Sequence, residues 1–396
     1  MSSLTHLDDA LALIVANAPR ITARETVSVR DSVSRVTAAA VTANVDLPRF
    51  TNTGVDGYAI IHDASVKEWP IIGASYAGAP FTGIVASGQA VRIATGAVLP
   101  EGADTVVMQE DCTVDGNRLT IVSLPQKGAA IRLKGADIAQ GDEAIAQGRW
   151  IGPQDMALLG ALNTTEVSVY RPVRIAVLSS GAELSAGADI AHGQVIDSNS
   201  AMIQKMLAGP SVRVDVLPAL PDRYDDTAQA LNDAAKAYDI VVTTGGVSVG
   251  DHDHIRDALH TIAKPVFWKL ALRPGKPVLV ARAGDCLFAG LPGNPVSAFV
   301  TTLLIVKPMI EAMYGMKAAL PPAYKMRLAG PVSKPAHLRV FARADLQNGG
   351  LRPYPDQSSN LYTSLTHADG LLDLPVGTTD YEAGDEVDFR PLRSWL

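Results

Sequence analysis

The segment from Asp239 to His254, DIVVTTGGVSVGDHDH, places an apolar strand, a glycine-rich loop and a helix start in direct succession. The β-branched run Ile240–Thr244 predicts a strand buried on both faces, which is typical of parallel sheets. The loop that follows is rich in small residues, Gly245, Gly246, Ser248 and Gly250. Backbone N–H groups at such a junction bind phosphate, and the adjacent Asp251 and Asp253 add oxygen ligands for a hard cation. A tight turn with Asp as a helix cap is the alternative.

The rhythm of strands and helices around this segment indicates a doubly wound parallel sheet. Apolar runs predict strands at 174–180, 212–217, 240–244, 266–270 and 286–290. Helical spacing predicts helices at 198–207, 225–238, 254–262 and 295–314. Asn199 or Ser200 fits the cap of the first of these helices. Alternating strands and helices place helices on both faces of the sheet, so we expect an α/β domain over residues 171–318.

The rest of the chain predicts three further domains, so the fold class is multidomain α/β. Amphipathic spacing predicts a helix at 5–17 and a shorter one at 30–36, and helical character returns near Asp137. Short strands and Gly/Pro turns fill the intervening stretch. We therefore expect a discontinuous helical domain I (1–43 plus 138–170), a β-rich domain II inserted into it (44–137), and a small C-terminal β domain IV (319–396).

Composition excludes several classes of protein. The chain has 396 residues, 47% of them hydrophobic, and a net charge of -7, which argues against a general nucleic-acid surface. The two cysteines, Cys112 and Cys286, form neither a disulfide framework nor a zinc site. The N-terminus lacks the features of a signal peptide, and the apolar run 298–306 is too short to span a bilayer. We expect a soluble cytoplasmic protein without a membrane partner.

A second strand-to-helix junction lies at 290–297, with the sequence GLPGNPVS. Pro295 fits the first helical position and Asn294 the N-cap, which leaves N–H groups free at the helix start. Ligands of open α/β sheets bind at the carboxyl ends of the strands, where both junctions are expected to lie. The alternative is a well-capped core helix with no ligand.

Between the two junctions lies a cluster of cations, Lys269, Arg273 and Lys276, beside a Pro-Gly turn. In an acidic protein, such a cluster next to two phosphate-type loops suits a polyanionic ligand. Ordinary surface charge is the alternative.

Carboxylates form a second group of candidates. Asp56, Asp137 and Glu183 lie in turns, and Thr95 follows a strand and offers a hydroxyl and an N–H group. Turns also use Asp for local hydrogen bonds, and sequence spacing leaves open whether these residues converge.

All of these motifs together resemble one known family. In order along nearly the whole chain they are LPRFTNTGVDGYA (47–59), IATGA (93–97), VVMQE (106–110), GADI (135–138), SGAEL (180–184), DSNS (197–200), the glycine-rich segment, KLALRPGKP (269–277), GLPGNPVS (290–297) and DQSSNLYTS (356–364). The set resembles the MoeA-type molybdopterin molybdenumtransferases, a family that includes the E domain of gephyrin.

The resemblance implies an enzyme of molybdenum cofactor biosynthesis. Such proteins insert molybdate into adenylated molybdopterin, with Mg2+-dependent hydrolysis and release of AMP. They have four domains and form elongated dimers, with the site between domain III of one subunit and domain II of the other. A molybdopterin adenylyltransferase and molybdoenzyme acceptors would be partners. Because the dithiolene sulfurs of the pterin accept the metal, no catalytic cysteine is needed.

The resemblance also implies a set of site residues. The catalytic residues would be Asp56, Thr95, Asp137 and Glu183. The Mg2+ ligands would come from Glu183, Asp222 and Asp251, although which carboxylates face Mg2+ and which face molybdate stays open. The substrate-binding residues would be Gly245, Gly246, Ser248, Gly250, Asp253, Lys269, Arg273, Lys276, Pro292, Asn294, Pro295, Arg343 and Ser364.

The sequence departs from the family pattern at two places. Arg273 stands where many relatives have lysine, and the two cations bind oxyanions differently. Thr53-Gly54-Val55 replaces the usual Ser-Ala-Met before Asp56, which keeps the hydroxyl. A molybdopterin adenylyltransferase is the first alternative function, although its typical Gly-Gly-Thr-Gly loop is Gly-Gly-Val-Ser here. A non-catalytic scaffold like gephyrin is the second.

Overall fold

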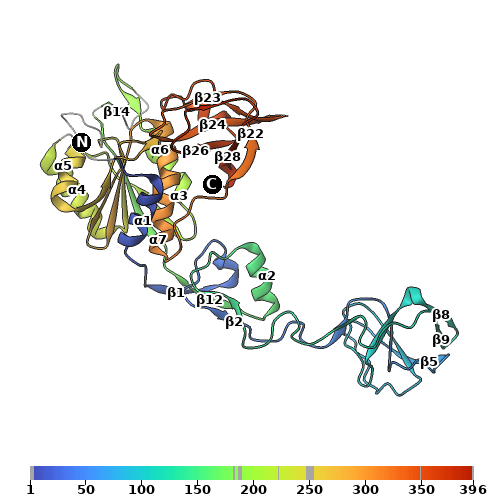
Figure 1. Ribbon diagram of the computed structural model, residues 1–396. Helices are drawn as coiled ribbons and strands as arrows, with labels where there is room; N and C mark the ends of the chain where they lie inside the picture. The colour runs from blue at the N-terminus through green and yellow to red at the C-terminus, as the bar shows by residue number, and fades with distance from the viewer. Residues whose placement is uncertain are drawn as a thin grey trace. The chain divides into compact units, whose positions relative to one another are not determined.

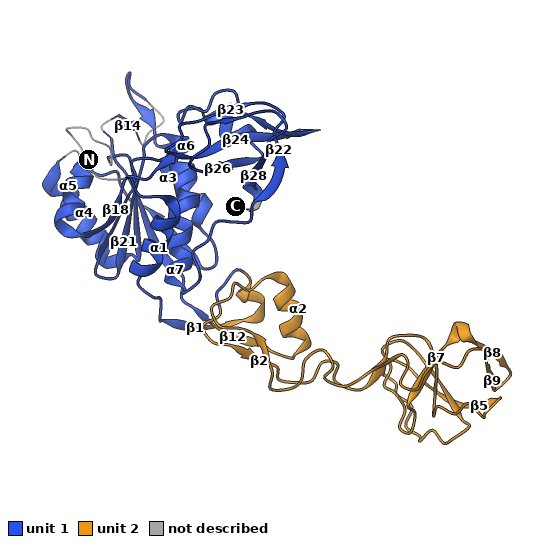
Figure 2. Cartoon of the chain, viewed as in Figure 1, with its two compact units in different colours: residues 1–25, 34–36, 169–396 blue, residues 26–33, 37–168 orange. Residues whose placement is uncertain are grey.

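The computed structural model describes residues 4–181, 183–185, 190–221, 223–246, 254–347 and 349–394. The chain divides into two compact units, coloured separately in Figure 2. Unit 1 contains residues 1–25, 34–36 and 169–396, and unit 2 contains residues 26–33 and 37–168. The finer division into four domains stays a prediction.

A six-stranded sheet forms the centre of unit 1. Its strands, in spatial order, are β16 (Val212–Val216), β13 (Val173–Ser179), β17 (Ile240–Thr244), β21 (Cys286–Leu291), β20 (Leu279–Ala283) and β18 (Lys264–Trp268). The first four run parallel, as predicted. One strand that the sequence did not predict runs in the opposite direction, because β20 pairs antiparallel with both β21 and β18. Only Gly284 and Asp285 separate β20 from β21, and so short a connection joins antiparallel strands.

Helices cover both faces of this sheet, which confirms the doubly wound arrangement (Figure 1). One face carries α1 (Leu7–Asn17), α3 (Ser198–Leu207), α6 (Pro295–Thr301) and α7 (Lys307–Met313). The other face carries α4 (Tyr224–Ala237) and α5 (His254–Ile262). Neighbouring residues of β17 show the alternation, because Val242 packs with the first group and Val241 with the second.

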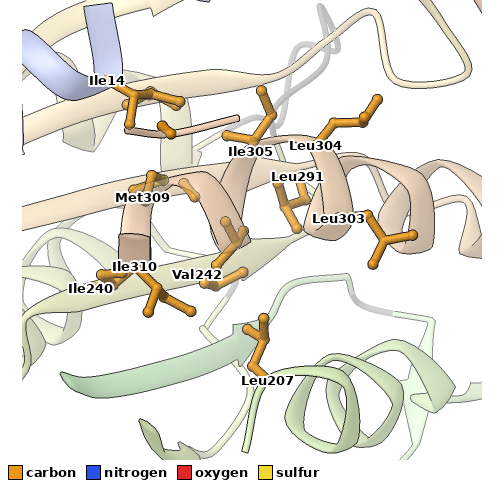
Figure 3. Packing of buried hydrophobic residues seen from close by; sticks show 14 of the residues in the cluster. Ile14, Leu207, Ile240, Val242, Leu291, Leu303, Leu304, Ile305, Met309 and Ile310 are labelled. Atoms are coloured by element: carbon orange, nitrogen blue, oxygen red, sulfur yellow. The ribbon is translucent and has the colours of Figure 1, made fainter. Parts of the chain in front are cut away.

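The helix at 295–313 is the core of unit 1. A π-helical turn, η3 (Thr302–Val306), joins α6 to α7, and the N–H of Lys307 donates to the carbonyl of Thr302. The turn precedes Pro308, which has no N–H group for a regular helical bond. Among the described residues, this run alone has the length and apolar composition of a membrane span, and 83% of its most apolar window is buried inside the protein. Figure 3 shows Leu303, Ile305 and Met309 packed in this core.

A second sheet of unit 1 is formed mainly by the C-terminal residues. It contains β19 (Leu272–Arg273), β24 (Arg339–Gln347), β26 (Gly370–Leu374), β28 (Glu386–Pro391) and β22 (Tyr324–Arg327), with β25 (Gly350–Pro353) paired to β24. Short elements complete the unit: β14 (Leu184–Ser185), β15 (Val195–Ile196), β23 (Val332–Ser333), β27 (Asp380–Tyr381), α8 (Tyr362–His367) and η4 (Leu392–Ser394). Because β19 belongs to the loop between β18 and β20, the cation cluster is attached to both sheets.

Unit 2 is rich in strands, as predicted. Its largest sheet has the order β7 (Thr105–Met108), β4 (Gly57–Ile60), β6 (Ala90–Ile93), β5 (Trp69–Ser75), β9 (Arg118–Ile121) and β8 (Cys112–Asp115). Two smaller sheets pair β10 (Ile131–Arg132) with β3 (Asn52–Thr53) and β11 (Glu143–Ile145) with β2 (Val41–Thr42). The unit also contains the 3-10 turn η2 (Gln109–Asp111) and the helix α2 (Pro153–Ala161). At the entry to the unit, β1 (Arg24–Ser28) pairs with β12 (Glu166–Tyr170).

Two local expectations were wrong. The helix predicted at 30–36 is a short 3-10 turn, η1 (Val29–Ser32), because Ser28 caps it through the N–H of Asp31 and Ser34 adopts a positive φ of 61°. The cap of α3 is Asp197, whose carboxylate accepts from the N–H of Ser200 at 3.0 Å.

Candidate active site

Two glycines let the chain turn sharply where β17 ends. Gly245 and Gly246 have positive φ angles of 86° and 65°, which side chains rarely tolerate. A Cβ atom on Gly245 would lie 2.5 Å from the carbonyl oxygen of Ser180, so the adjacent strand end also requires glycine. The N–H of Gly245 donates to the carbonyl of Leu291 at 3.1 Å. Gly245 therefore shapes the loop, but its N–H is not available for phosphate as the sequence suggested.

Asn199 ties the two predicted loops together. Its Nδ2 donates to Thr244 Oγ1 at 2.9 Å and to the carbonyl of Gly293 at 2.8 Å. One amide therefore fixes the end of β17 against the turn that begins α6. From the sequence, Asn199 was predicted only as a possible helix cap, and its role in joining the loops was not predicted, although it lies in the DSNS motif.

The start of α6 is closed by a segment of the C-terminal sheet. The N–H of Val296 donates to the carbonyl of Ser359 at 3.1 Å, and Asn294 Nδ2 donates to Ser359 Oγ at 2.9 Å. Asn294 occupies the N-cap position but its side chain makes no capping bond. The expected free N–H groups at this helix start are thus reduced, since Pro295 has none and that of Val296 is used. Pro292 and Pro295 are buried.

The predicted cations lie on the loop that joins β18 to β20. Lys269 is half-buried, whereas Arg273 and Lys276 are exposed. The N–H of Leu270 donates to the carbonyl of Lys276 at 2.9 Å, which brings the two ends of the cluster together. A Cβ atom on Gly275 would lie 2.3 Å from Thr301 Cγ2, so the loop packs closely on α6. The loop that carries the cation cluster therefore packs against the C-terminal end of α6.

Arg343 on β24 and Ser364 on α8 contact one another in unit 1. Arg343 is 0% exposed, and its Nε donates to Ser364 Oγ at 3.0 Å. Its other nitrogens donate to three carbonyls, those of Asp356, Gln357 and Ser358. Burial lowers the pKa of Arg343 to about 10. The negative charge of Asp356 partly opposes this shift, and the positive charge of Arg273 adds to it. The guanidinium thus stays charged at neutral pH and holds the 356–358 loop, while its predicted contact with substrate stays a prediction.

Glu183 follows β13 at the same edge of the sheet. Its side chain is exposed and folds over Gly181, where an added Cβ atom would lie 2.6 Å from the carboxylate oxygens. The carbonyl of Glu183 accepts from the N–H of Val195 at 2.8 Å, which anchors the loop. Five other predicted residues lie outside the described residues: Asp222, Ser248, Gly250, Asp251 and Asp253. Among the described residues, no group of three or more His, Cys, Asp or Glu side chains is arranged around a common metal position.

In unit 2, Asp56 and Thr95 form one polar pair. Asp56 Oδ1 accepts from the N–H of Thr95 at 2.7 Å and from its Oγ1 at 3.0 Å. Both bonds lower the pKa of Asp56, the bond from the Thr95 N–H more than the bond from its hydroxyl group. The positive charge of Arg92 adds to the effect. Asp56 Oδ2 accepts no hydrogen bond from the described residues. The pair therefore presents an ionised carboxylate oxygen at the exposed surface of the unit.

Asp137 is also exposed in unit 2, and its N–H donates to the carbonyl of Leu47 at 2.9 Å. No hydrogen bond joins its carboxylate to Asp56 or Thr95 in the part of the chain that the structure describes. Arg132 is a further cation near the Asp56 turn, because a Cβ atom on Gly54 would lie 2.5 Å from its Nη2. Arg132 was not predicted from the sequence, because it has no motif of its own. The pairing of β10 with β3 brings it there.

Neither cysteine suits nucleophilic chemistry. Burial raises the pKa of Cys286 to about 12, and burial with the charges of Asp111 and Glu110 raises that of Cys112 to about 11. Both thiols therefore stay protonated at neutral pH and are unreactive.

Models of known families match almost the whole chain. Residues 5–162 match the MoeA N-terminal region (domain I and II), residues 176–312 a probable molybdopterin binding domain, and residues 325–392 the MoeA C-terminal region (domain IV).

Relatives of known name agree with these matches. The chain is 32% identical to the molybdopterin molybdenumtransferase of Haemophilus influenzae, over 98% of this chain and 99% of that protein. It is 33% identical to the protein of that name from Staphylococcus aureus, over 92% of this chain and 90% of the other. Among solved structures, the molybdopterin biosynthesis moeA protein of Pyrococcus horikoshii is 26% identical, with a TM-score of 0.82, over 98% of this chain and 99% of that one. The chain belongs to the MoeA family, the molybdopterin molybdenumtransferases of molybdenum cofactor biosynthesis.

Proposed function

We propose that the chain inserts molybdate into adenylated molybdopterin, and that Mg2+-dependent hydrolysis of the adenylylated phosphate releases AMP. One observation carries the proposal. The loop with Lys269, Arg273 and Lys276 packs on α6, whose start Asn199 ties to the end of β17. In support, β18 runs in the same direction as β21, and Lys269 directly follows it, so the loop with the three cations begins at the carboxyl edge of the sheet. Folds of this class bind ligands at that edge. Phosphates and the molybdate dianion are ligands that suit this charge.

The carboxylates have a different task in this proposal. A lowered pKa makes Asp56 a poor proton acceptor near neutral pH, so it acts as a charged ligand rather than as a general base. The exposed oxygens of Glu183 are of the type that Mg2+ prefers, and they would hold it together with the predicted Asp222 and Asp251. Bound Mg2+ would polarise the scissile phosphate. Thr95 orients Asp56 through both of its hydrogen bonds.

A homodimer is part of the proposal. The carboxylates Asp56 and Asp137 belong to unit 2, whereas Glu183 and the cations belong to unit 1. A site shared between subunits, as the family resemblance implies, would draw its two halves from these separate units. We propose the cytoplasm as the location, a molybdopterin adenylyltransferase as supplier of the substrate, and molybdoenzymes as acceptors of the product.

Incubation with adenylated molybdopterin, molybdate and Mg2+ tests the proposed function. We expect AMP release together with a product that activates an apo-molybdoenzyme, and loss of both when EDTA removes Mg2+. Asp56→Ala should stay folded and lose metal insertion. If the wild-type chain bound the pterin tightly without turnover, the result would support a scaffold. If it formed adenylated pterin from ATP, the result would support an adenylyltransferase.

A further inference from the structure

A lysine of the cation cluster sits on an aromatic ring. Lys269 Nζ lies 4.0 Å from the centroid of the Trp268 ring, within the range of a cation–π interaction. Trp268 is the last residue of β18 and pairs with Leu279 of β20. Lys269 is the first residue beyond the strand.

The backbone at Lys269 makes this contact available. Successive side chains of a strand point to opposite faces, so Trp268 and Lys269 would ordinarily diverge. Lys269 instead has a φ of 68°, in the left-handed region that non-glycine residues seldom adopt, and the alternation is broken. Its N–H donates to the carbonyl of Val278 at 2.9 Å and its carbonyl accepts from the N–H of Thr5 at 3.0 Å. Two hydrogen bonds thus hold the unusual conformation in place.

The ring itself is held mainly by packing. Trp268 packs against the buried cluster beneath α4 and α5. Its Nε1 is buried and has no hydrogen-bond partner among the described residues. The guanidinium of Arg256 lies 5.8 Å from the ring centroid. The indole is therefore a platform fixed by core contacts.

The positive charge of Lys269 is not neutralised by the residues that the structure describes. No carboxylate among the described residues forms an ion pair with Lys269, and the ring attracts the ammonium through its quadrupole without cancelling its charge. A free lysine side chain loses rotamer freedom when a ligand orders it, and that loss weakens binding. A lysine already held on a ring avoids part of the loss.

We propose that Trp268 is a positioning residue that holds the Lys269 ammonium ready for the phosphate-bearing substrate. The proposal rests on the function proposed above and assigns the ring to substrate binding rather than to the chemical step. Trp268 acts through Lys269, so its effect requires the lysine.

A double-mutant cycle tests this dependence, with KM and kcat measured for adenylated molybdopterin. Trp268→Leu should raise KM about fivefold to tenfold and leave kcat within about twofold, because it removes a cation–π contact. Trp268→Phe keeps an aromatic face and should recover most of the loss. In a Lys269→Met background, Trp268→Leu should raise KM by less than about twofold, because coupled residues are not additive.

A merely structural role would give another pattern. Equal effects of Trp268→Leu in both backgrounds, or a fall in kcat and in melting temperature with KM unchanged, would overturn the proposal. Trp150→Leu, a tryptophan outside the cluster, is the matched control and should leave KM unchanged.

Inorganic pyrophosphate separates this inference from the proposed function. The four proteins of the cycle are the wild type, Trp268→Leu, Lys269→Met and the double variant. Each is titrated with pyrophosphate by calorimetry, which requires no turnover. If the wild-type chain releases no AMP but the pyrophosphate affinities are non-additive, the proposed function fails and the role of Trp268 stands. If AMP is released and the cycle is additive, the role of Trp268 fails alone. A wild-type chain that neither turns over nor binds pyrophosphate overturns both.

Discussion

At the scale of single residues, Asp56 and Thr95 illustrate how a turn carboxylate becomes a functional candidate. The sequence placed the two residues in separate motifs, and only the pairing of β4 with β6 brings them together. Hydrogen bonds to the ionised form stabilise it and lower the pKa of the carboxyl group. The pair is thus adapted to stay charged rather than to exchange a proton.

The lowered pKa of Asp56 predicts the acid side of the pH–activity profile. Activity that requires ionised Asp56 should persist below the usual range of an Asp carboxyl group. Thr95→Ala removes one of the two stabilising bonds, so the acid limb should move to higher pH. At pH 7 both proteins keep Asp56 ionised, because an ordinary Asp has a pKa of about 3.9.

A steady-state pH profile of AMP release measures the effect. Thr95→Ser keeps the hydroxyl and should keep the wild-type limb. An unchanged limb in Thr95→Ala would show that the hydroxyl does not tune the group that limits activity.

Among the helices and strands, sequence patterns predicted those elements whose bounds depend on their own residues. The strand Ile240–Thr244 and the helix His254–Ile262 have the predicted bounds, because an uninterrupted apolar run and a strong helical periodicity define them. Strand β20 was missed, since a hairpin partner and not its own pattern determines it. The role of Asn199 was missed for the same reason, because its acceptors Thr244 and Gly293 are distant in sequence.

The start of β17 carries a prediction about stability. Asp239 accepts two bonds from Arg171, at 2.7 and 2.8 Å, and one from the N–H of Arg174. Burial raises its pKa, but these bonds outweigh burial and the net pKa is lowered. A carboxyl group whose pKa is lower in the folded than in the unfolded protein stabilises the fold at pH values above the unfolded pKa. This stabilisation is lost as the pH falls through the folded pKa. Asp239→Asn should cost about 3 kcal/mol at pH 7.

Urea denaturation of both proteins at neutral and acid pH measures this cost. The difference should shrink as the pH falls below the ordinary Asp pKa of about 3.9 and through the lowered pKa of folded Asp239, where the wild-type carboxyl group becomes protonated. Asp285→Asn is the control, since that side chain is 95% exposed and its ion pair is long, at 3.8 Å. A cost that does not change with pH would show that charge at Asp239 is not the cause.

At the scale of the whole molecule, the predicted site is divided between two compact units. Asp56, Thr95 and Asp137 belong to unit 2, and the cation cluster with Arg343 belongs to unit 1. The fold class and the family could be predicted from the sequence, since motifs recur in order along the chain. The shared site that we propose could not be predicted from a local pattern, because it requires two subunits to assemble.

Subunit mixing tests a shared site. In a heterodimer of an Asp56→Ala subunit and a Lys276→Ala subunit, a site built across subunits is intact at one of its two copies and doubly altered at the other. We expect about half of the wild-type activity in isolated heterodimers, while each variant alone stays inactive. Inactive heterodimers would place both halves of each site in the same subunit.

We propose that hydrolysis and metal insertion are one coupled event at the proposed site. The most direct measurement counts AMP released and molybdenum incorporated in the same reaction, with and without molybdate. We predict equal amounts of the two products, molybdate-dependent AMP release, and loss of both in Lys276→Ala. AMP release without incorporated molybdenum, or incorporation without AMP, would show that the two steps are not coupled.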